Sequence, residues 1–326
     1  MPIVSQAILE AADVHDSVLH ARLYLRFGSF LLHQGQHRMA AQAVEIAAGH
    51  LPEIGADSYH LEQVLLLLRT QAQRSHQELE KSPNLIETAC SLAEKVDDPE
   101  LTAELYLDEC HILLQEGDSI AAPKAYGLAK KAYALWRHRG VVPHAHYSAL
   151  LRIKAARIMS KFQRADRLIR WLKPKVNIDG TRIIYADLLY EEGSIALYLD
   201  DLVRAETCLS KAASIFEDLK MMHHWAASCM VLSLALIADQ QYDAANQALE
   251  TASNAWERLQ YDAGHVRVKI YAAYSAIKRS HFAEAQSLLQ DAHTLLEGVS
   301  NNKLKQALLA EIEDMESRID NQPART

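Results

Sequence analysis

Apolar and polar positions alternate along this chain with a period of forty residues. Five alanines mark the period: Ala125, Ala165, Ala205, Ala245 and Ala285. Apolar or small residues follow four, seven and eleven positions later, as Leu209, Ala212 and Phe216 do after Ala205. These spacings lie on one face of an α-helix, because 3.6 residues make one turn. The pattern therefore predicts a buried helical stripe that recurs in every unit of a repeat array.

A second helix precedes each alanine helix. Short polar junctions separate the two, at 199–202, 239–242 and 279–282, and predict turns between antiparallel helices. The alanine is expected where the helices cross, since a larger side chain would push the backbones apart. An earlier unit is centred on Ala40, and the longer interval from there to Leu85 implies an insertion.

The repeat phase predicts one continuous domain over residues 1–326, with about seven helical hairpins and a final helix at 303–319. The final helix has apolar residues on one face only, as a terminal cap requires. The predicted hairpins cover approximately residues 20–52, 60–98, 101–139, 144–176, 183–220, 225–260 and 266–298.

The repeated residues resemble the tetratricopeptide repeat (TPR). The resemblance rests on four features: a small residue in the first helix (Gly28, Gly193), the marker alanine, an aromatic or large residue three positions before that alanine, and a small residue seven positions after it. The family's usual period is about 34 residues, so this chain is similar to its long-helix branches. HEAT and armadillo arrays share the longer period, but the pattern of small residues where the two helices cross favours the TPR. The resemblance implies an all-α, TPR-like right-handed α-solenoid.

One stretch resembles a particular member of that superfamily. Between Ala132 and Ala186, the segment Lys173–Gly180 is similar to the late repeats of anaphase-promoting complex subunit five. A proline and an Asp-Gly turn are also what any connection between helices uses. The resemblance implies a subunit of a similar ubiquitin ligase, and the simpler interpretation is an ordinary turn.

Composition sets the compartment and the partners that we expect. No secretory signal or membrane-spanning run is present, and the four cysteines have no Cys-x-x-Cys spacing, so a reducing, cytoplasmic or nuclear location is predicted. The formal charge is −8 with both signs interspersed, which argues against nucleic acid and a broad basic surface but leaves open a local basic patch. We expect no membrane partner.

Sequence motifs for catalysis are lacking. The eleven glycines form neither a dinucleotide nor a phosphate loop, and no Ser or Cys stands in a recognisable nucleophile turn. His33 and His37 have the four-residue spacing of zinc ligands on a helix, but Gly35 places them across a helix end. We therefore predict a protein that is not an enzyme and holds no metal or cofactor.

The resemblance implies that first-helix residues form a partner-binding groove. Counting back from each alanine places these positions on that face: Tyr147, Lys154, Arg157, Asp187, Tyr190, Ser194, Met230, Leu234, Ile237, Arg267 and Tyr274. Lys154 and Arg157 could hold a carboxylate, while Met230, Leu234 and Ile237 form an apolar strip. Packing between repeats is the alternative role for these residues.

Two functions fit such a groove. The first is a non-enzymatic protein-protein interaction scaffold, a subunit of a larger hetero-complex, whose apolar groove is covered by a partner segment. The second is a peptide-sensing regulatory protein of the TPR class, in which the basic and tyrosine-rich wall captures an acidic peptide. The scaffold predicts a large apolar interface, and the sensor predicts a polar groove.

Overall fold

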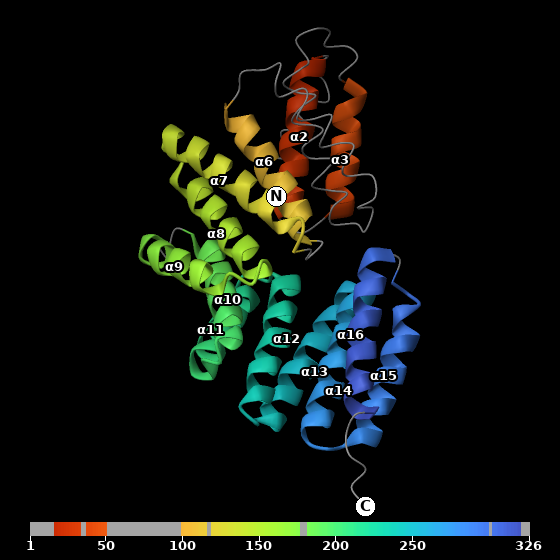
Figure 1. The fold of residues 1–326 in the computed structure, drawn as a ribbon. Helices are drawn as coiled ribbons and strands as arrows, with labels where there is room; N and C mark the ends of the chain where they lie inside the picture. Colours follow the sequence, from red (N-terminus) through yellow and green to blue (C-terminus); the bar gives the residue numbers. More distant parts are fainter. Residues whose placement is uncertain are drawn as a thin grey trace, which may run out of the picture. The chain divides into compact units, whose positions relative to one another are not determined.

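The computed structural model describes residues 16–33, 37–50, 99–115, 119–176, 181–299 and 302–320. In these ranges the regular structure consists of thirteen α-helices and one short 3₁₀ helix, without strands (Figure 1). The chain divides into two compact units, Met1–Leu151 (unit 1) and Arg152–Thr326 (unit 2). The all-α prediction is confirmed. None of the described helices is both long and apolar enough to cross a bilayer.

In its described residues, unit 1 contains two helical hairpins, α2 with α3 and α6 with α7. Its helices are α2 (Ser17–His33), α3 (His37–His50), α6 (Pro99–Gln115), α7 (Ala122–Arg139) and the first part of α8 (Val142–Ile158). The hairpin predicted at 60–98 and the expected insertion after Ala40 lie outside the described residues. Ala125 and Trp136 are buried in α7, as the repeat phase requires.

Unit 2 stacks three further hairpins, α10 with α11, α12 with α13 and α14 with α15. Its helices are the end of α8, α9 (Phe162–Leu172), the 3₁₀ helix η4 (Lys173–Lys175), α10 (Arg182–Tyr198), α11 (Leu202–Asp218), α12 (Met222–Ala238), α13 (Tyr242–Leu259), α14 (Asp262–Lys278), α15 (Phe282–Leu296) and α16 (Asn302–Asp320). Helix α16 packs on α14 and α15 through Leu308 and Ile312, which confirms the predicted capping helix.

The alanine register forms the core. All five marker alanines have no exposed surface, and Leu209, Leu249 and Leu289, four positions later, are at most 3% exposed. Phe216 and Trp256 close the stripe eleven positions on, at 1% and 2% exposure. Burying each of these large side chains stabilises the fold by about 1.5–3 kcal/mol. The same repeated positions therefore hold each second helix against its neighbours.

Helix boundaries follow a rhythm of twenty residues. Helices α7 to α16 begin at positions 122, 142, 162, 182, 202, 222, 242, 262, 282 and 302. A left-handed residue ends most of them: Gly140, Ser160, Asp200, Lys220, Gln240, Gln260 and Ser280. The backbone amide of Gln240 donates a hydrogen bond to the carbonyl oxygen of Ile237. The backbone amide of Gln241 donates one to the carbonyl oxygen of Leu236. This Schellman pairing satisfies the last carbonyls and turns the chain back, so successive helices begin twenty residues apart.

Gly193 lets the two helices of one hairpin approach closely. A Cβ atom at this position would lie 2.6 Å from Leu209 Cγ and 3.1 Å from the carbonyl oxygen of Ala205. Helix α10 thus contacts α11 directly over the marker alanine. The first-helix small residue of the repeat pattern has a packing role at this position.

Candidate functional site

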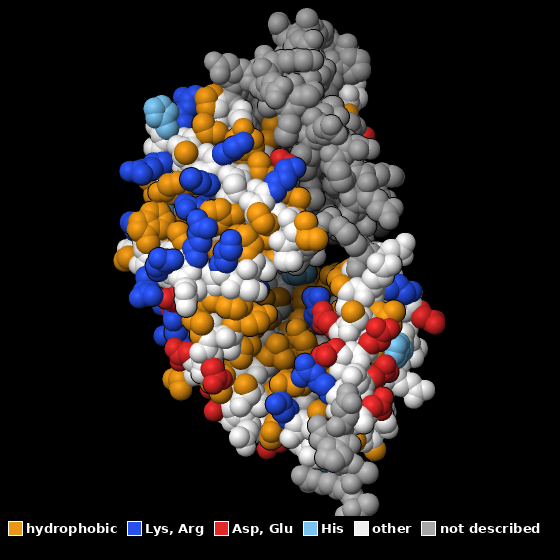
Figure 2. Space-filling model, in the orientation of Figure 1, with side chains coloured by type: hydrophobic (Ala, Val, Ile, Leu, Met, Phe, Trp, Pro, Cys, Tyr) orange, Lys and Arg blue, Asp and Glu red, His pale blue; other side chains and the backbone are white. Residues whose placement is uncertain are grey.

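Side chains from the first helices of unit 2 and from its capping helix gather into one polar wall. We call this set the inner wall: Lys154 and Arg157 on α8, Asp187, Tyr190 and Glu191 on α10, Arg267 and Tyr271 on α14, and Glu311 on α16. Figure 2 shows unit 2 hollowed where α10, α12 and α14 lie, with orange side chains, a class that includes tyrosine, on the floor and charged ones toward α16. The second helices contribute none of these residues.

An ion pair between α8 and α10 anchors the wall. Arg157 Nε donates to Glu191 Oε2 at 2.6 Å, and Arg157 Nη2 donates to Glu191 Oε1 at 3.2 Å. The side chains are only 19% and 5% exposed. Burial opposes the charge of Arg157, but Glu191 outweighs it and raises the pKa of the guanidinium. The fork of Arg157 is thus already filled by a carboxylate of the same chain.

A second pair and two tyrosines continue the wall toward α16. Arg267 Nη2 donates to Glu311 Oε1 at 3.2 Å. Burial raises the pKa of Tyr271 to about 12, and Arg267 opposes that rise. Burial also raises the pKa of Tyr190, a hydroxyl on which the charges of Arg157, Glu191 and Arg267 all act. Groups from α8, α10 and α14 therefore face a common space.

Lys154 and Asp187 are the two wall charges without a direct ion pair among the described side chains. Both are half-buried. Burial raises the pKa of Asp187 to about 7, with Lys154 opposing the rise and Glu191 adding to it. The wall thus offers a cation and a carboxyl group that a ligand can engage without breaking an internal pair.

The raised pKa of Asp187 predicts a pH-dependent stability. The folded chain holds this proton more tightly than the unfolded chain does, so the Asp187 contribution to stability falls as pH rises from about 4 to 7. Asp187→Asn removes that loss. We expect its stability advantage over the wild type to grow by about 1–3 kcal/mol between pH 5 and pH 8.

Urea unfolding of both proteins at pH 5 and pH 8 measures this difference. The stability contributions of the other titrating groups are the same in both proteins and therefore cancel. Asp239→Asn, at an exposed position, provides the control. An advantage that is equal at pH 5 and pH 8 would contradict the environment described for Asp187.

The structure brings together five of the residues predicted for the groove: Lys154, Arg157, Asp187, Tyr190 and Arg267. Tyr274 lies on the same helix as Arg267, with Lys278 Nζ 5.4 Å and Arg318 Cζ 5.8 Å from its ring centroid. It is half-buried, so its ring and hydroxyl are partly accessible.

Other predicted groove residues have a packing role, the alternative that the sequence left open. Ser194, Met230 and Ile237 are 4%, 6% and 1% exposed, and Leu234 is half-buried. Met230 Sδ accepts a hydrogen bond from Trp256 Nε1 at 3.3 Å. Tyr147 belongs to unit 1, where its hydroxyl is hydrogen-bonded to His111 Nε2. Most of the expected apolar strip is thus inside the fold.

Three wall residues were missed from the sequence. Glu191 and Tyr271 occupy the same repeat position, fourteen residues before Ala205 and Ala285. That position lies four residues, about one helical turn, after the predicted groove position of Asp187 and Arg267, so the spacing could have identified both. Glu311 lies in the capping helix, where the repeat phase gives no guide.

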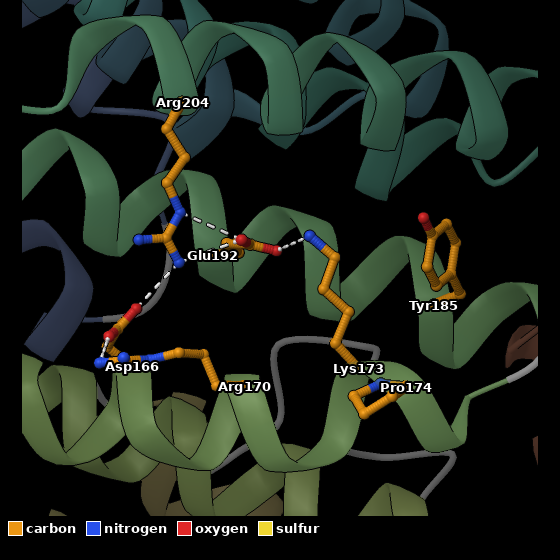
Figure 3. Close-up of a pocket in the computed structure, with 7 residues that line it drawn as sticks. All are labelled: Asp166, Arg170, Lys173, Pro174, Tyr185, Glu192 and Arg204. Carbon is orange, nitrogen blue, oxygen red and sulfur yellow. Dashed lines mark hydrogen bonds and ion pairs between the residues drawn. The ribbon is translucent and has the colours of Figure 1, made fainter.

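A second polar cluster lies on another side of unit 2, between α9, η4, α10 and α11 (Figure 3). It surrounds a depression of about 800 Å³ lined by Asp166, Arg170, Lys173, Pro174, Tyr185, Glu192 and Arg204. Arg204 bridges Asp166 at 2.9 Å and Glu192 at 3.0 Å, and Lys173 reaches Glu192 at 2.7 Å. These bonds link successive hairpins.

The electrostatics of this cluster favour the charged forms of Asp166 and Arg204. Burial alone would raise the pKa of Asp166, but hydrogen bonds from Arg204 and Arg170 hold it below its ordinary value. Because each carboxylate has a cationic partner, the cluster is an inter-repeat ion network. No repeated residue pattern predicts this network.

The described side chains include no group of three or more His, Cys, Asp or Glu arranged to hold a metal ion. Side chains of His33 and His37 lie outside the described set. Cys110, Cys208 and Cys229 are buried free thiols, and burial raises the pKa of Cys229 to about 11. A raised pKa disfavours the reactive thiolate.

No family model matches the sequence, and no curated protein matches it. Among solved structures, a Rap protein complexed with competence and sporulation factor has a TM-score of 0.61 at 12% identity, over 93% of this chain and 99% of that one. The apo form of RapI has a TM-score of 0.52 at 13% identity, over 80% and 100%.

A third similar structure is a signal transduction ATPase (STAND protein) with a tetratricopeptide repeat sensor from Pyrococcus horikoshii. Its TM-score is 0.54 at 16% identity, over 94% of this chain but 50% of that one. At these identities the likeness concerns the fold. The chain has the fold of TPR-like helical solenoids, which confirms the resemblance seen in the repeats. The likeness to anaphase-promoting complex subunit five stays a prediction.

Proposed function

We propose that this protein binds a peptide segment of a protein partner on the inner wall of unit 2 and has no catalytic role. The observation that carries the proposal is the convergence of tyrosines and charged groups from α8, α10, α14 and α16 on one wall. Such groups supply the donors and acceptors that an extended peptide needs, and tyrosine offers apolar contact area at little cost in entropy. The TPR-like fold also supports a protein-interaction role.

The wall's polarity favours the peptide-sensing alternative over the scaffold. The scaffold requires an apolar strip at Met230, Leu234 and Ile237, but Met230 and Ile237 are buried in packing. Lys154 and Asp187 remain to engage a ligand carboxylate and a ligand cation. The Rap protein of similar fold was solved complexed with competence and sporulation factor, which supports a binding role for this architecture.

A random peptide library displayed on phage and selected on the full chain tests the proposal. We expect enriched peptides whose affinity falls about ten- to hundredfold in Lys154→Glu, because a charge-assisted hydrogen bond is replaced by repulsion. Lys211→Glu makes the same charge change on the exposed face of α11 and should leave affinity unchanged.

Two outcomes would contradict binding at this wall. Either the selection enriches no peptide, or the enriched peptides lose affinity equally in Lys154→Glu and Lys211→Glu. Purification from the native cell with mass spectrometry separates the alternatives. Stoichiometric recovery of several large subunits would favour the scaffold, and recovery of one partner lost in Lys154→Glu would favour the peptide-binding role.

A further inference from the structure

Helix α10 carries three carboxyl groups in its middle, and two of them have cationic partners. Glu191 accepts hydrogen bonds from Arg157. Glu192 accepts one from Arg204. Asp187, one turn before Glu191 on the same helix face, accepts no hydrogen bond and forms no ion pair among the described side chains. A half-buried carboxyl group without a partner adds nothing to packing, so it points to another role.

Lys154 on α8 acts on Asp187, but the two side chains form no direct ion pair. Beside them Arg157 and Glu191, from the same two helices, are in contact at 2.6 Å. Burial raises the pKa of Asp187 to about 7, Lys154 opposes that rise, and the like charge of Glu191 adds to it. A proton therefore occupies this carboxyl group in about half of the unliganded molecules at neutral pH.

The titratable groups nearest to Asp187 on α10 and α12 stay neutral as it titrates. Burial raises the pKa of Tyr190, and the charge of Asp187 adds to the rise. Desolvation, followed by the charges of His223 and Lys154, lowers the pKa of His224 on α12 to about 4. A change of charge at Asp187 thus alters a part of the wall where these two neighbours carry none.

Cations on the other helices near α10 are already paired. Arg267 on α14 donates to Glu311 on α16. Arg204 on α11 donates to Glu192 and to Asp166 on α9. These side chains are committed to internal pairs, so the open carboxyl group of the wall is left for a proton or for a cation from outside the chain.

We propose that Asp187 is a subsite for a cationic group of the bound peptide and that this cation displaces a proton from the carboxyl group. The subsite rests on the proposed function, since its ligand is the peptide at the inner wall. A Lys or Arg side chain or an amino terminus of the peptide completes the ion pair that the chain leaves open. Because proton and cation compete for one carboxyl group, affinity rises as pH rises through 7.

The expected stability of Asp187→Asn distinguishes this role from a structural one. Replacing a carboxyl group that serves packing destabilises a protein, whereas Asp187→Asn is expected to stabilise this chain increasingly above pH 5. A residue that costs stability and improves binding is typical of a ligand site. The same substitution should therefore raise stability and weaken peptide binding at pH 8.

Isothermal titration calorimetry of the full chain tests the proposal, with the tightest-binding peptide of a phage selection at pH 8.0 as the probe. We expect the affinity to rise about tenfold or more between pH 5.5 and pH 8.0. In buffers of different ionisation enthalpy, binding at pH 6 should release about one proton. Asp187→Asn should lose both effects, and Asp239→Asn, at an exposed position, should keep them.

The outcomes separate this subsite from the proposed function. No peptide binding at either pH would contradict binding at the inner wall, and the subsite with it. Binding that Lys154→Glu weakens, but that is equal at both pH values or has the same pH dependence in Asp187→Asn, would overturn the subsite alone. His223 and the titrating groups of the peptide are the same in both measurements, so comparison of wild type with Asp187→Asn removes their contribution.

Discussion

Replacing Arg157 by leucine is expected to lower the free energy of unfolding by about 3–5 kcal/mol, the largest effect of any single change considered. The substitution leaves Glu191, with a side chain only 5% exposed, buried without its partner. Glu191 must then either keep an unpaired charge or take up a proton, and both cost stability. Urea unfolding followed by circular dichroism measures the loss.

Two controls isolate the ion pair. Replacing both Arg157 and Glu191 by leucine removes the unpaired charge and should restore most of the stability. Arg182→Leu breaks a pair with Asp218 whose side chains are 43% and 56% exposed, and should cost at most about 1 kcal/mol. If Arg157→Leu costs no more than Arg182→Leu, the inner wall does not hold a buried pair.

Gly193→Ala should destabilise unit 2 by about 1–3 kcal/mol, because the added methyl group overpacks the hairpin crossing. The new Cβ would lie 2.6 Å from Leu209 Cγ and 3.1 Å from the carbonyl oxygen of Ala205, a backbone atom that cannot easily yield. Thermal unfolding provides the measurement.

Gly127→Ala is the matched control within helix α7. A Cβ there meets nothing within 4 Å, so the change should stabilise by about 0.5–1 kcal/mol through helix propensity. Opposite signs for the two glycines are the expected result. Stabilisation by both would mean that α10 and α11 do not approach as closely as described.

The alanine register was predictable from the sequence because it serves packing, which every repeat must solve in the same way. One residue type, Ala205 and its equivalents, recurs wherever two helices cross, so periodicity alone located the buried stripe. The twenty-residue rhythm of helix ends has no such residue signal. Its left-handed positions include Ser160, Lys220 and Gln240, which share spacing but no residue type.

The candidate site was only partly predictable, because its members are not repeated. The phase placed Lys154, Arg157 and Tyr190 on one face, and the structure brings them together. It could not show that Glu191 fills the guanidinium fork of Arg157, since that pairing depends on the neighbouring repeat.

Burial at a single repeat position also varies with its surroundings. Tyr190 and Met230 occupy the same repeat position, fifteen residues before Ala205 and Ala245, but Trp256 donates a hydrogen bond to Met230 and packs against it inside the fold. A bulky residue on the second helix of the same hairpin therefore covers this groove position. This covering changed the expected wall from partly apolar to polar, and with it the function that we propose.

Site-specific photo-crosslinking in the native cell tests the central claim most directly. A benzophenone amino acid is placed at Tyr190 or Tyr271 on the inner wall, or at Val203, which is 79% exposed on α11. The account predicts that both wall positions capture one peptide segment of the same partner and that Val203 does not. Capture at Val203 alone, or none from either wall position, would contradict partner binding at the inner wall.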